Sequence, residues 1–186
     1  MHSYPSATIS RHAFSGGLGV TNRGSWAGNV KMLSQDQSPV NIAAKGTLDW
    51  ATRTLELTVQ LYYTADSKVE TNALNVAVLQ DNILGSQSGG SNYNPDQMVN
   101  GKYNHMHMLR YLITGQWGET IETTKAGTFV EKKYTYVIPE KLGNPGPIAA
   151  ELKDLNFLCF VAEGKTDVDR QITAFKYTSS SDVDVK

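Results

Sequence analysis

The sequence has little of what marks several classes of protein. Its 186 residues include a single cysteine, Cys159, which excludes an intrachain disulfide and a Cys-x-x-Cys redox centre within this chain. The 17 Lys and Arg residues nearly balance the 18 Asp and Glu residues, so the formal charge is only −1. Such a balance gives no electrostatic reason to bind nucleic acid or an anionic membrane. We therefore expect no nucleic-acid partner and no cofactor.

Long apolar runs are also missing. The stretch 158–162 is among the longest, and it is far shorter than the roughly 20 residues that cross a bilayer as a helix. We expect no transmembrane segment. The basic residues near Met1 precede no continuous apolar core, so we expect any export signal to lie outside this chain. The apolar neighbours of Cys159 favour a buried small hydrophobe over a reactive nucleophile.

Short strands are the pattern that is present. Apolar and polar residues alternate over 42–50 and 55–61, and the short link between these runs predicts an antiparallel hairpin. The segment 73–79 is apolar on both faces, which is typical of a central strand covered on both sides. Further strands are expected at 106–114, 133–138, 156–162 and 171–177, with one or two helical turns within 148–155. The expected fold class is all-β: an antiparallel β-sandwich, Ig-like or jelly-roll-like, with long loops and one short helix.

Glycine-rich and polar stretches divide the chain. The glycines of 15–19 place a boundary near residues 12–24, so we expect the sandwich to span 25–178 and residues 179–186 to form a flexible tail. The polar segment 81–102 has little periodicity. Loops longer than about 12–15 residues are uncommon in compact domains and are often functional, and we expect its glycine-rich part to be mobile.

His105 and His107 form the sharpest local motif. In a regular strand they point to the same face and could share a metal ion, but a site needs a further ligand. Asp81, Gln87 and Asp96 in the preceding segment are the candidates. The alternative is a hydrogen-bonded structural pair beside a central strand, and we expect this alternative, with no metal bound.

Arg110 would share the opposite face of that strand with Met106 and Met108. A guanidinium half-buried among apolar groups needs a carboxylate or several carbonyls, and we expect Asp81 to be its partner.

Aromatic residues are the other candidates for a binding site. They could line a platform on which a sugar stacks, but aromatic residues also simply populate half-buried sheet surfaces, and we favour this second interpretation. No strand-turn-helix context holds a serine near a histidine, so no catalytic residue is expected. The aromatic candidates are Tyr62, Tyr63, Tyr93, Tyr103, Tyr111 and Trp117.

Three segments, 74–87, 103–110 and 114–118, together resemble one family, the Bacteroidetes outer membrane protein twenty-eight family. The resemblance rests on a strand that ends in Asp-Asn, a glutamine a few residues later, a His-x-His-x-x-Arg strand and a Trp-Gly pair, and it covers about 4–177. The residues that carry it are Asp81, Asn82, Gln87, His105, His107, Arg110, Trp117 and Gly118.

The resemblance implies a surface lipoprotein of the outer membrane in which a thioredoxin-like domain precedes a β-sandwich. Tyr4-Pro5 would match the cis-proline loop of the thioredoxin unit and 8–11 the following strand, which makes 1–24 a remnant of that domain plus a linker. Such a remnant could pair with a sheet edge of a second copy, which is a route to a homodimer.

Family members largely lack an assigned activity. We expect a noncatalytic interaction or accessory domain at the cell surface whose partner is an unidentified protein or glycan. One alternative is a metal- or glycan-binding module that uses the 81–102 segment and the histidine strand. Another is a domain that positions substrates for a thioredoxin-like oxidoreductase.

Overall fold

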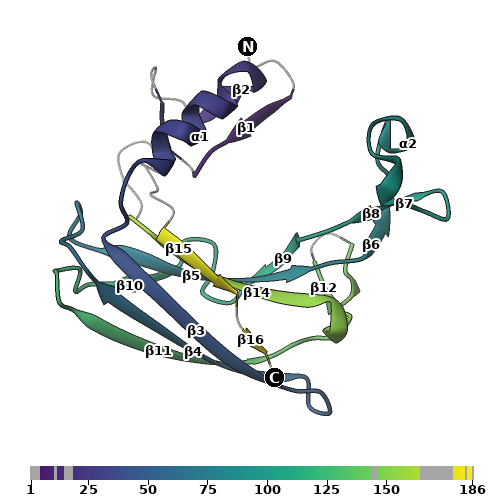
Figure 1. Ribbon diagram of the computed structural model, residues 1–186. Helices are drawn as coiled ribbons and strands as arrows, with labels where there is room; N and C mark the ends of the chain where they lie inside the picture. The colour runs from purple at the N-terminus through teal and green to yellow at the C-terminus, as the bar shows by residue number, and fades with distance from the viewer. Residues whose placement is uncertain are drawn as a thin grey trace.

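A computed structural model describes residues 5–10, 12–14, 19–143, 146–163, 178–182 and 184–185. Two larger sheets pack face to face, and smaller strand pairs lie around them (Figure 1). Among the described strands, all pairs are antiparallel except that of β16 with β3. The expected all-β sandwich is therefore confirmed.

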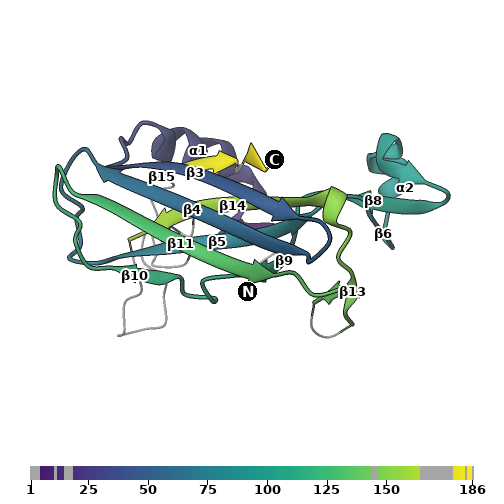
Figure 2. The same ribbon diagram turned by 90° about the horizontal axis from the view of Figure 1, so that it is seen from below.

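The first large sheet contains the predicted hairpin. Its strands, in order, are β11 (Phe129–Val137), β4 (Thr54–Tyr63), β3 (Val40–Asp49) and β16 (Asp184–Val185). Burial along β4 alternates because one face of the sheet covers the core and the other meets water. Figure 2 shows β3, β4 and β11 in front, with the rest of the sandwich behind them.

The second large sheet is built around β5 (Asn72–Gln80). β14 (Leu155–Ala162) pairs with one edge of β5, and β10 (Glu119–Ile121) and β9 (Met108–Leu112) share the other edge. β15 (Thr178–Asp182) extends the sheet beyond β14. Nearly every residue of β5 is buried, which confirms the prediction of a central strand covered on both sides.

The core fills the space between these two sheets. It combines the inward residues of β4 and β5 with those of β14, including Phe157, Cys159 and Val161. Cys159 is fully buried, as its apolar neighbours predict, and burial raises the pKa of its thiol to about 12. The thiol is therefore a packing group and a poor nucleophile.

Glu119 joins the edges of the two sheets. Its carboxylate on β10 accepts hydrogen bonds from Lys132 Nζ at 2.5 Å and from the Tyr134 hydroxyl at 2.6 Å, both on β11. Burial raises the pKa of Glu119, but the bonds from Lys132 and Tyr134 outweigh burial and hold the pKa below its ordinary value. Burial and the bond to Glu119 raise the pKa of Tyr134.

This contact makes stability depend on pH. Because the folded pKa of Glu119 lies below its unfolded value of 4.5, the ionised carboxylate contributes stability that is fully present above that value and is lost as the pH falls through the folded pKa. We expect Glu119→Gln to unfold at a lower temperature than the parent at neutral pH and the difference to disappear in acid. Thermal unfolding from about pH 2 to 7 measures this. Glu122→Gln is the control, and a pH-independent deficit for Glu119→Gln would contradict the prediction.

The chain before β3 differs from the prediction. A hairpin of β1 (Ser6–Thr8) and β2 (Val20–Asn22), the 3-10 turn η1 (Arg23–Ser25) and helix α1 (Trp26–Ser34) lie beside the sandwich, whereas the sequence predicts sandwich from residue 25 (Figure 1). The sequence did not predict this helix because it contains Gly28, which disfavours helix, and because no side chain caps its start. Within the described part of 5–34 no residue is buried.

The end of the chain also differs. One or two helical turns were expected within 148–155. The 3-10 turn η3 (Leu152–Asp154) supplies one, but β13 (Ile148–Ala149) before it pairs with β12 (Lys141–Leu142). A flexible tail was expected at 179–186. Instead, β15 pairs with β14 in the second large sheet, and β16 pairs with β3 in the first. The strand predicted at 171–177 lies outside the described residues. No helix within the described ranges is long and apolar enough to cross a membrane.

Candidate functional site

Residues 82–107 form an arm that projects from one end of the sandwich (Figure 1). Three short strands pair in the order β6-β8-β7, and one short helix and one 3-10 turn connect them. The elements are β6 (Ile83–Gly85), α2 (Gly90–Tyr93), η2 (Pro95–Gln97), β7 (Met98–Val99) and β8 (Lys102–His105). The expectation of a long irregular loop is therefore wrong, because this segment has its own secondary structure.

The arm continues the pairing of β5 with β9 after a sharp bend. Gln80 pairs with Met108 in the large sheet, and Ile83 pairs with His105 in the arm. Between these pairs Asn82 and His107 both have left-handed backbone, with φ of 58° and 53°. Both strands thus bend at the same level, and the arm leaves the plane of the sheet.

Asp81 lies at this bend and ties the two strands together. Its Oδ1 accepts a hydrogen bond of 2.6 Å from the backbone N–H of His107 and lies 3.1 Å from Nδ1 of the same residue. Its Oδ2 accepts a bond of 2.9 Å from Asn156 Nδ2 on β14. One carboxylate therefore fastens the base of the arm to the sandwich.

A second set of contacts supports Asp81. Asn82 Nδ2 donates to Asp154 Oδ1 at 2.8 Å, and Asn82 Oδ1 accepts from Asn104 Nδ2 at 3.1 Å. The backbone N–H of Asp81 donates to the carbonyl of Asp154 at 2.9 Å. We call the group of Asp81, Asn82, Asn104, His107, Asp154 and Asn156 the brace. The sequence interpretation missed Asp154 and Asn156, because nothing local connects 154–156 with 81–82. Asn104 lies within the segment 103–110 that carries the family resemblance, but it was given no role.

Tyr103 contacts two other residues within the arm. Its ring lies 5.0 Å from that of His105, and its hydroxyl accepts a bond of 3.0 Å from Asn94 Nδ2. A β-carbon on Gly90 would lie 2.9 Å from the Tyr103 ring, and one on Gly85 would lie 3.1 Å from His105 Nε2. These glycines are required for close packing, so the mobility expected for 85–91 is not what their contacts indicate.

The shared face of His105 and His107 is not found. β8 ends at His105, and His107 has left-handed backbone outside any strand, so the two-residue alternation of a strand does not apply. Asp81 meets His107, whereas Gln87 and Asp96 are exposed elsewhere on the arm. Among the described residues, no three His, Cys, Asp or Glu side chains come together as metal ligands. The histidines instead have structural contacts.

The expected pairing of Arg110 with Asp81 is not found. Its guanidinium donates to the backbone carbonyls of Leu142 and Ile148, which were the other type of partner considered. Burial lowers the pKa of Arg110. Asp81 binds His107 at the bend, whereas Arg110 lies beyond the bend on β9, so the two side chains do not meet.

The aromatic candidates are dispersed. Tyr63 is fully buried and donates to Asn72 Oδ1 at 2.9 Å, while Tyr103 lies within the arm. Tyr111 on β9 stacks on Tyr136 of β11, with ring centres 5.2 Å apart. Tyr62 on β4 and Trp117 in the turn between β9 and β10 are about half exposed, and Tyr93 lies on the arm. One platform built from all six residues is therefore not formed.

Gly118 is a motif residue that lies very close to the central strand β5. It ends the turn between β9 and β10, and its backbone has a φ of 80°. A β-carbon there would lie 2.8 Å from the carbonyl oxygen of Leu74 and 2.9 Å from Asn75 Nδ2, both on β5. The turn can lie on β5 only without a side chain at this position.

The comparison with protein families matches residues 1–167 to the model of the outer membrane protein Omp28. The chain belongs to the Omp28 family. It is therefore a protein associated with the outer membrane. Among solved structures, it resembles a domain of the outer membrane lipoprotein Omp28 from Porphyromonas gingivalis, with 16% identity, a TM-score of 0.44, and coverage of 81% of this chain and 92% of that chain. No curated protein matches the sequence.

The residues that carry the Omp28 resemblance can now be placed. Asp81, Asn82 and His107 belong to the brace, His105 packs in the arm, and Gly118 fits against β5. Most of the motif residues thus hold the arm on the sandwich, pack within the arm or allow the turn before β10 to lie on β5.

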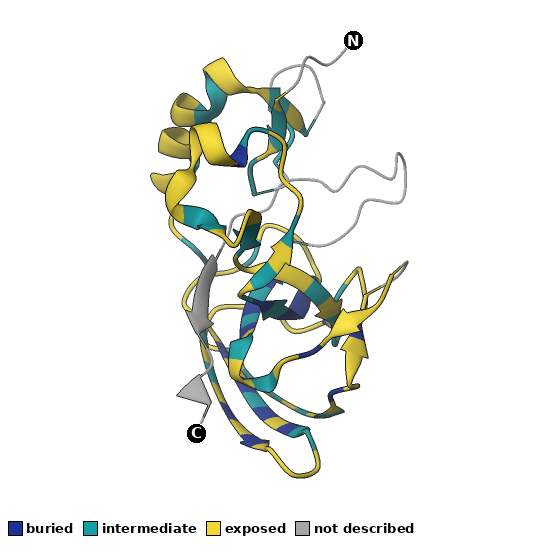
Figure 3. Cartoon of the chain, turned by 90° about the vertical axis from the view of Figure 1, so that its right-hand side faces the viewer, coloured by how far each residue is buried: buried dark blue, intermediate teal, exposed yellow. Residues whose placement is uncertain are grey.

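The surface of the arm carries apolar side chains in water. Tyr93, at the end of α2, is 90% exposed. Leu84, Val99 and Met106 are each exposed by 40% or more. Figure 3 looks toward the arm and shows mostly exposed and intermediate residues there, with the buried ones concentrated in the sandwich. The arm therefore exposes several large apolar side chains that take no part in the core.

Proposed function

We propose that this chain is a noncatalytic accessory domain at the outer membrane surface that binds a partner protein through its arm. The observation that carries the proposal is the exposed apolar surface of an arm fastened by the brace. An exposed aromatic residue on a fixed support contributes to binding with little loss of conformational entropy, because the support is already ordered before the partner arrives.

Several features support an interaction role over catalysis. Cys159 is buried in the core, and its raised pKa keeps it protonated at neutral pH. Both oxygens of the Asp81 carboxylate accept hydrogen bonds, one from the backbone N–H of His107 and the other from Asn156. Tyr93, by contrast, extends into solvent with nearly its whole side chain, and tyrosine is enriched at the centres of protein interfaces.

Site-specific photo-crosslinking tests the proposal in intact cells. A photoreactive phenylalanine analogue replaces Tyr93 in one variant and Trp50 in the control. Trp50 suits this purpose because it is an exposed aromatic residue in the turn between β3 and β4. We expect a discrete protein adduct from position 93 and none from position 50. An adduct equally strong at both positions, or none at position 93, would refute an interface on the arm.

A further inference from the structure

A second surface, on the outer face of the first large sheet, has the chemistry of a binding site. Phe129 on β11 and Tyr62 on β4 are directly paired across neighbouring strands, so their side chains lie next to each other on the same face. Both point away from the core, and their exposed fractions are 57% and 49%. The two rings lie side by side in water and form an apolar platform outside the core.

A hollow continues from this platform along the sheet. Its volume is about 470 Å³, and its lining side chains belong mostly to the outer face of β3 and β4, the strands that lie in front in Figure 2. Gln60 at its near end is two residues from Tyr62 on the same strand and the same face. The small side chain of Ala43, paired with Gln60 on β3, leaves space where a longer one would fill it. The side chains that line the hollow include Ala43, Lys45, Glu56, Thr58, Gln60 and Lys133.

The polar and charged side chains in and beside the hollow pair with one another. Glu131 accepts a hydrogen bond of 2.8 Å from Gln60 Nε2 and lies 3.3 Å from Lys133 Nζ. In the row beyond, Glu56 accepts a bond of 2.8 Å from the Thr135 hydroxyl. Lys45 and Lys133 balance Glu56 and Glu131 in formal charge. The surface therefore offers many donors and acceptors without a net charge that would select a charged ligand.

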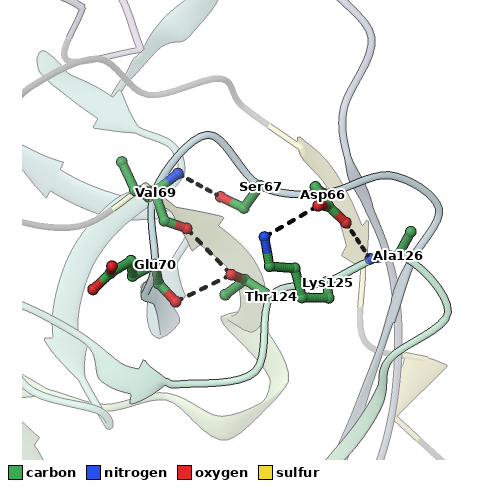
Figure 4. Close-up of polar contacts among 7 residues, drawn as sticks. All are labelled: Asp66, Ser67, Val69, Glu70, Thr124, Lys125 and Ala126. Carbon is green, nitrogen blue, oxygen red and sulfur yellow. Dashed lines mark hydrogen bonds and ion pairs between the residues drawn. The ribbon is translucent and has the colours of Figure 1, made fainter.

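The two aromatic residues are held by ordered loops. β4 ends and β11 begins beside the loops 64–71 and 122–128, which Figure 4 shows in contact. Lys125 Nζ lies 3.1 Å from Asp66 Oδ2, the backbone N–H of Ala126 donates to Asp66 Oδ1 at 2.9 Å, and the Thr124 hydroxyl donates to the carbonyl of Glu70 at 3.1 Å. These bonds fix the strand ends that carry the rings, so the platform is arranged before a ligand binds.

We infer that this face binds a neutral oligosaccharide. Sugars have apolar faces that stack on aromatic rings and hydroxyl groups that exchange hydrogen bonds with amides, hydroxyls and carboxylates. The Tyr62 and Phe129 platform, followed by the rows of Gln60 and Thr58, offers both in that order along the strands. Successive rows on one face lie about 7 Å apart, so the platform and the next two rows span roughly 14 Å, enough for a short linear chain of sugars.

Isothermal titration with defined sugars tests the inference. The probes are linear neutral hexasaccharides of glucose, xylose, mannose, galactose and N-acetylglucosamine, with a hexamer of galacturonic acid as the charged comparison. We expect at least one neutral hexamer to bind. Tyr62→Ala and Phe129→Ala should each weaken its binding tenfold or more. Leu109→Ala is the matched control, because Leu109 is as exposed as Phe129 but lies on β9 of the other sheet.

Several outcomes would overturn the inference. These are no binding of any neutral hexamer at millimolar concentration, binding of the acidic hexamer alone, or equal losses in Leu109→Ala and the two ring variants. The melting temperature of each variant checks that folding is intact, which is expected because all three residues are on the surface. Backbone amide NMR gives an independent readout, since the bound sugar should shift the signals of Gln60 and Glu131. The arm is a separate surface, so failure of one proposal leaves the other standing.

Discussion

Replacing Gly118 with alanine is expected to lower the free energy of unfolding by about 2–4 kcal/mol. Part of this loss, roughly 1–2 kcal/mol, comes from a side chain on left-handed backbone with φ of 80°. The rest comes from overlap with the carbonyl oxygen of Leu74, which would be 2.8 Å from the new β-carbon. That carbonyl belongs to β5, the central strand of the second sheet, and cannot withdraw without disturbing its neighbours.

Gly115→Ala provides the matched control in the same turn. Its φ of 75° is nearly the same, but a β-carbon there would meet no atom within 4 Å. We expect this variant to lose only the backbone contribution, about 1–2 kcal/mol. Urea denaturation of both variants measures the difference. Equal losses would show that left-handed backbone alone accounts for the glycine and that close packing on β5 contributes nothing.

Asp81→Ala is expected to release the arm while the sandwich stays folded. The change removes both carboxylate oxygens of Asp81 and leaves the N–H of His107 and the Asn156 amide without their carboxylate partner. Hydrogen bonds to a charged group contribute about 1.5–3 kcal/mol each, so opening of the arm should become easier by at least that amount. Amide hydrogen exchange in 83–105 should accelerate roughly tenfold or more.

Mass spectrometry of the exchanging amides makes this prediction local. Exchange within β4 should change little, because its residues pack in the core between the two large sheets. Asp96→Ala is the control, since Asp96 is exposed in η2 of the same arm. If exchange in the arm is unaffected by Asp81→Ala, or is equally fast in Asp96→Ala, the brace does not hold the arm. The photo-crosslink expected at position 93 should weaken in Asp81→Ala for the same reason.

The candidate site was only partly predictable from sequence. Asp81, Asn82 and His107 were singled out by their pattern, and they do meet at one place. The predicted contacts were partly wrong, because a regular strand through 105–110 would have put His105 and His107 on one face. The pairing of Asp81 with Arg110 was expected only from the need of a half-buried guanidinium for a partner. The left-handed backbone of His107 ends the strand pattern there. Histidine occurs in both extended and left-handed backbone, so the residue type did not predict the bend.

The sequence by itself determined the sandwich. Alternation along β3 and β4 fixes which face is buried. The apolar run of β5 requires cover on both sides, because exposing either face would leave many apolar groups in water. Only the tertiary structure decided where Asp81 finds Asn156 and where Tyr62 meets Phe129. These contacts join residues 75 and 67 positions apart, and such pairings depend on strand register across the whole fold rather than on any local pattern.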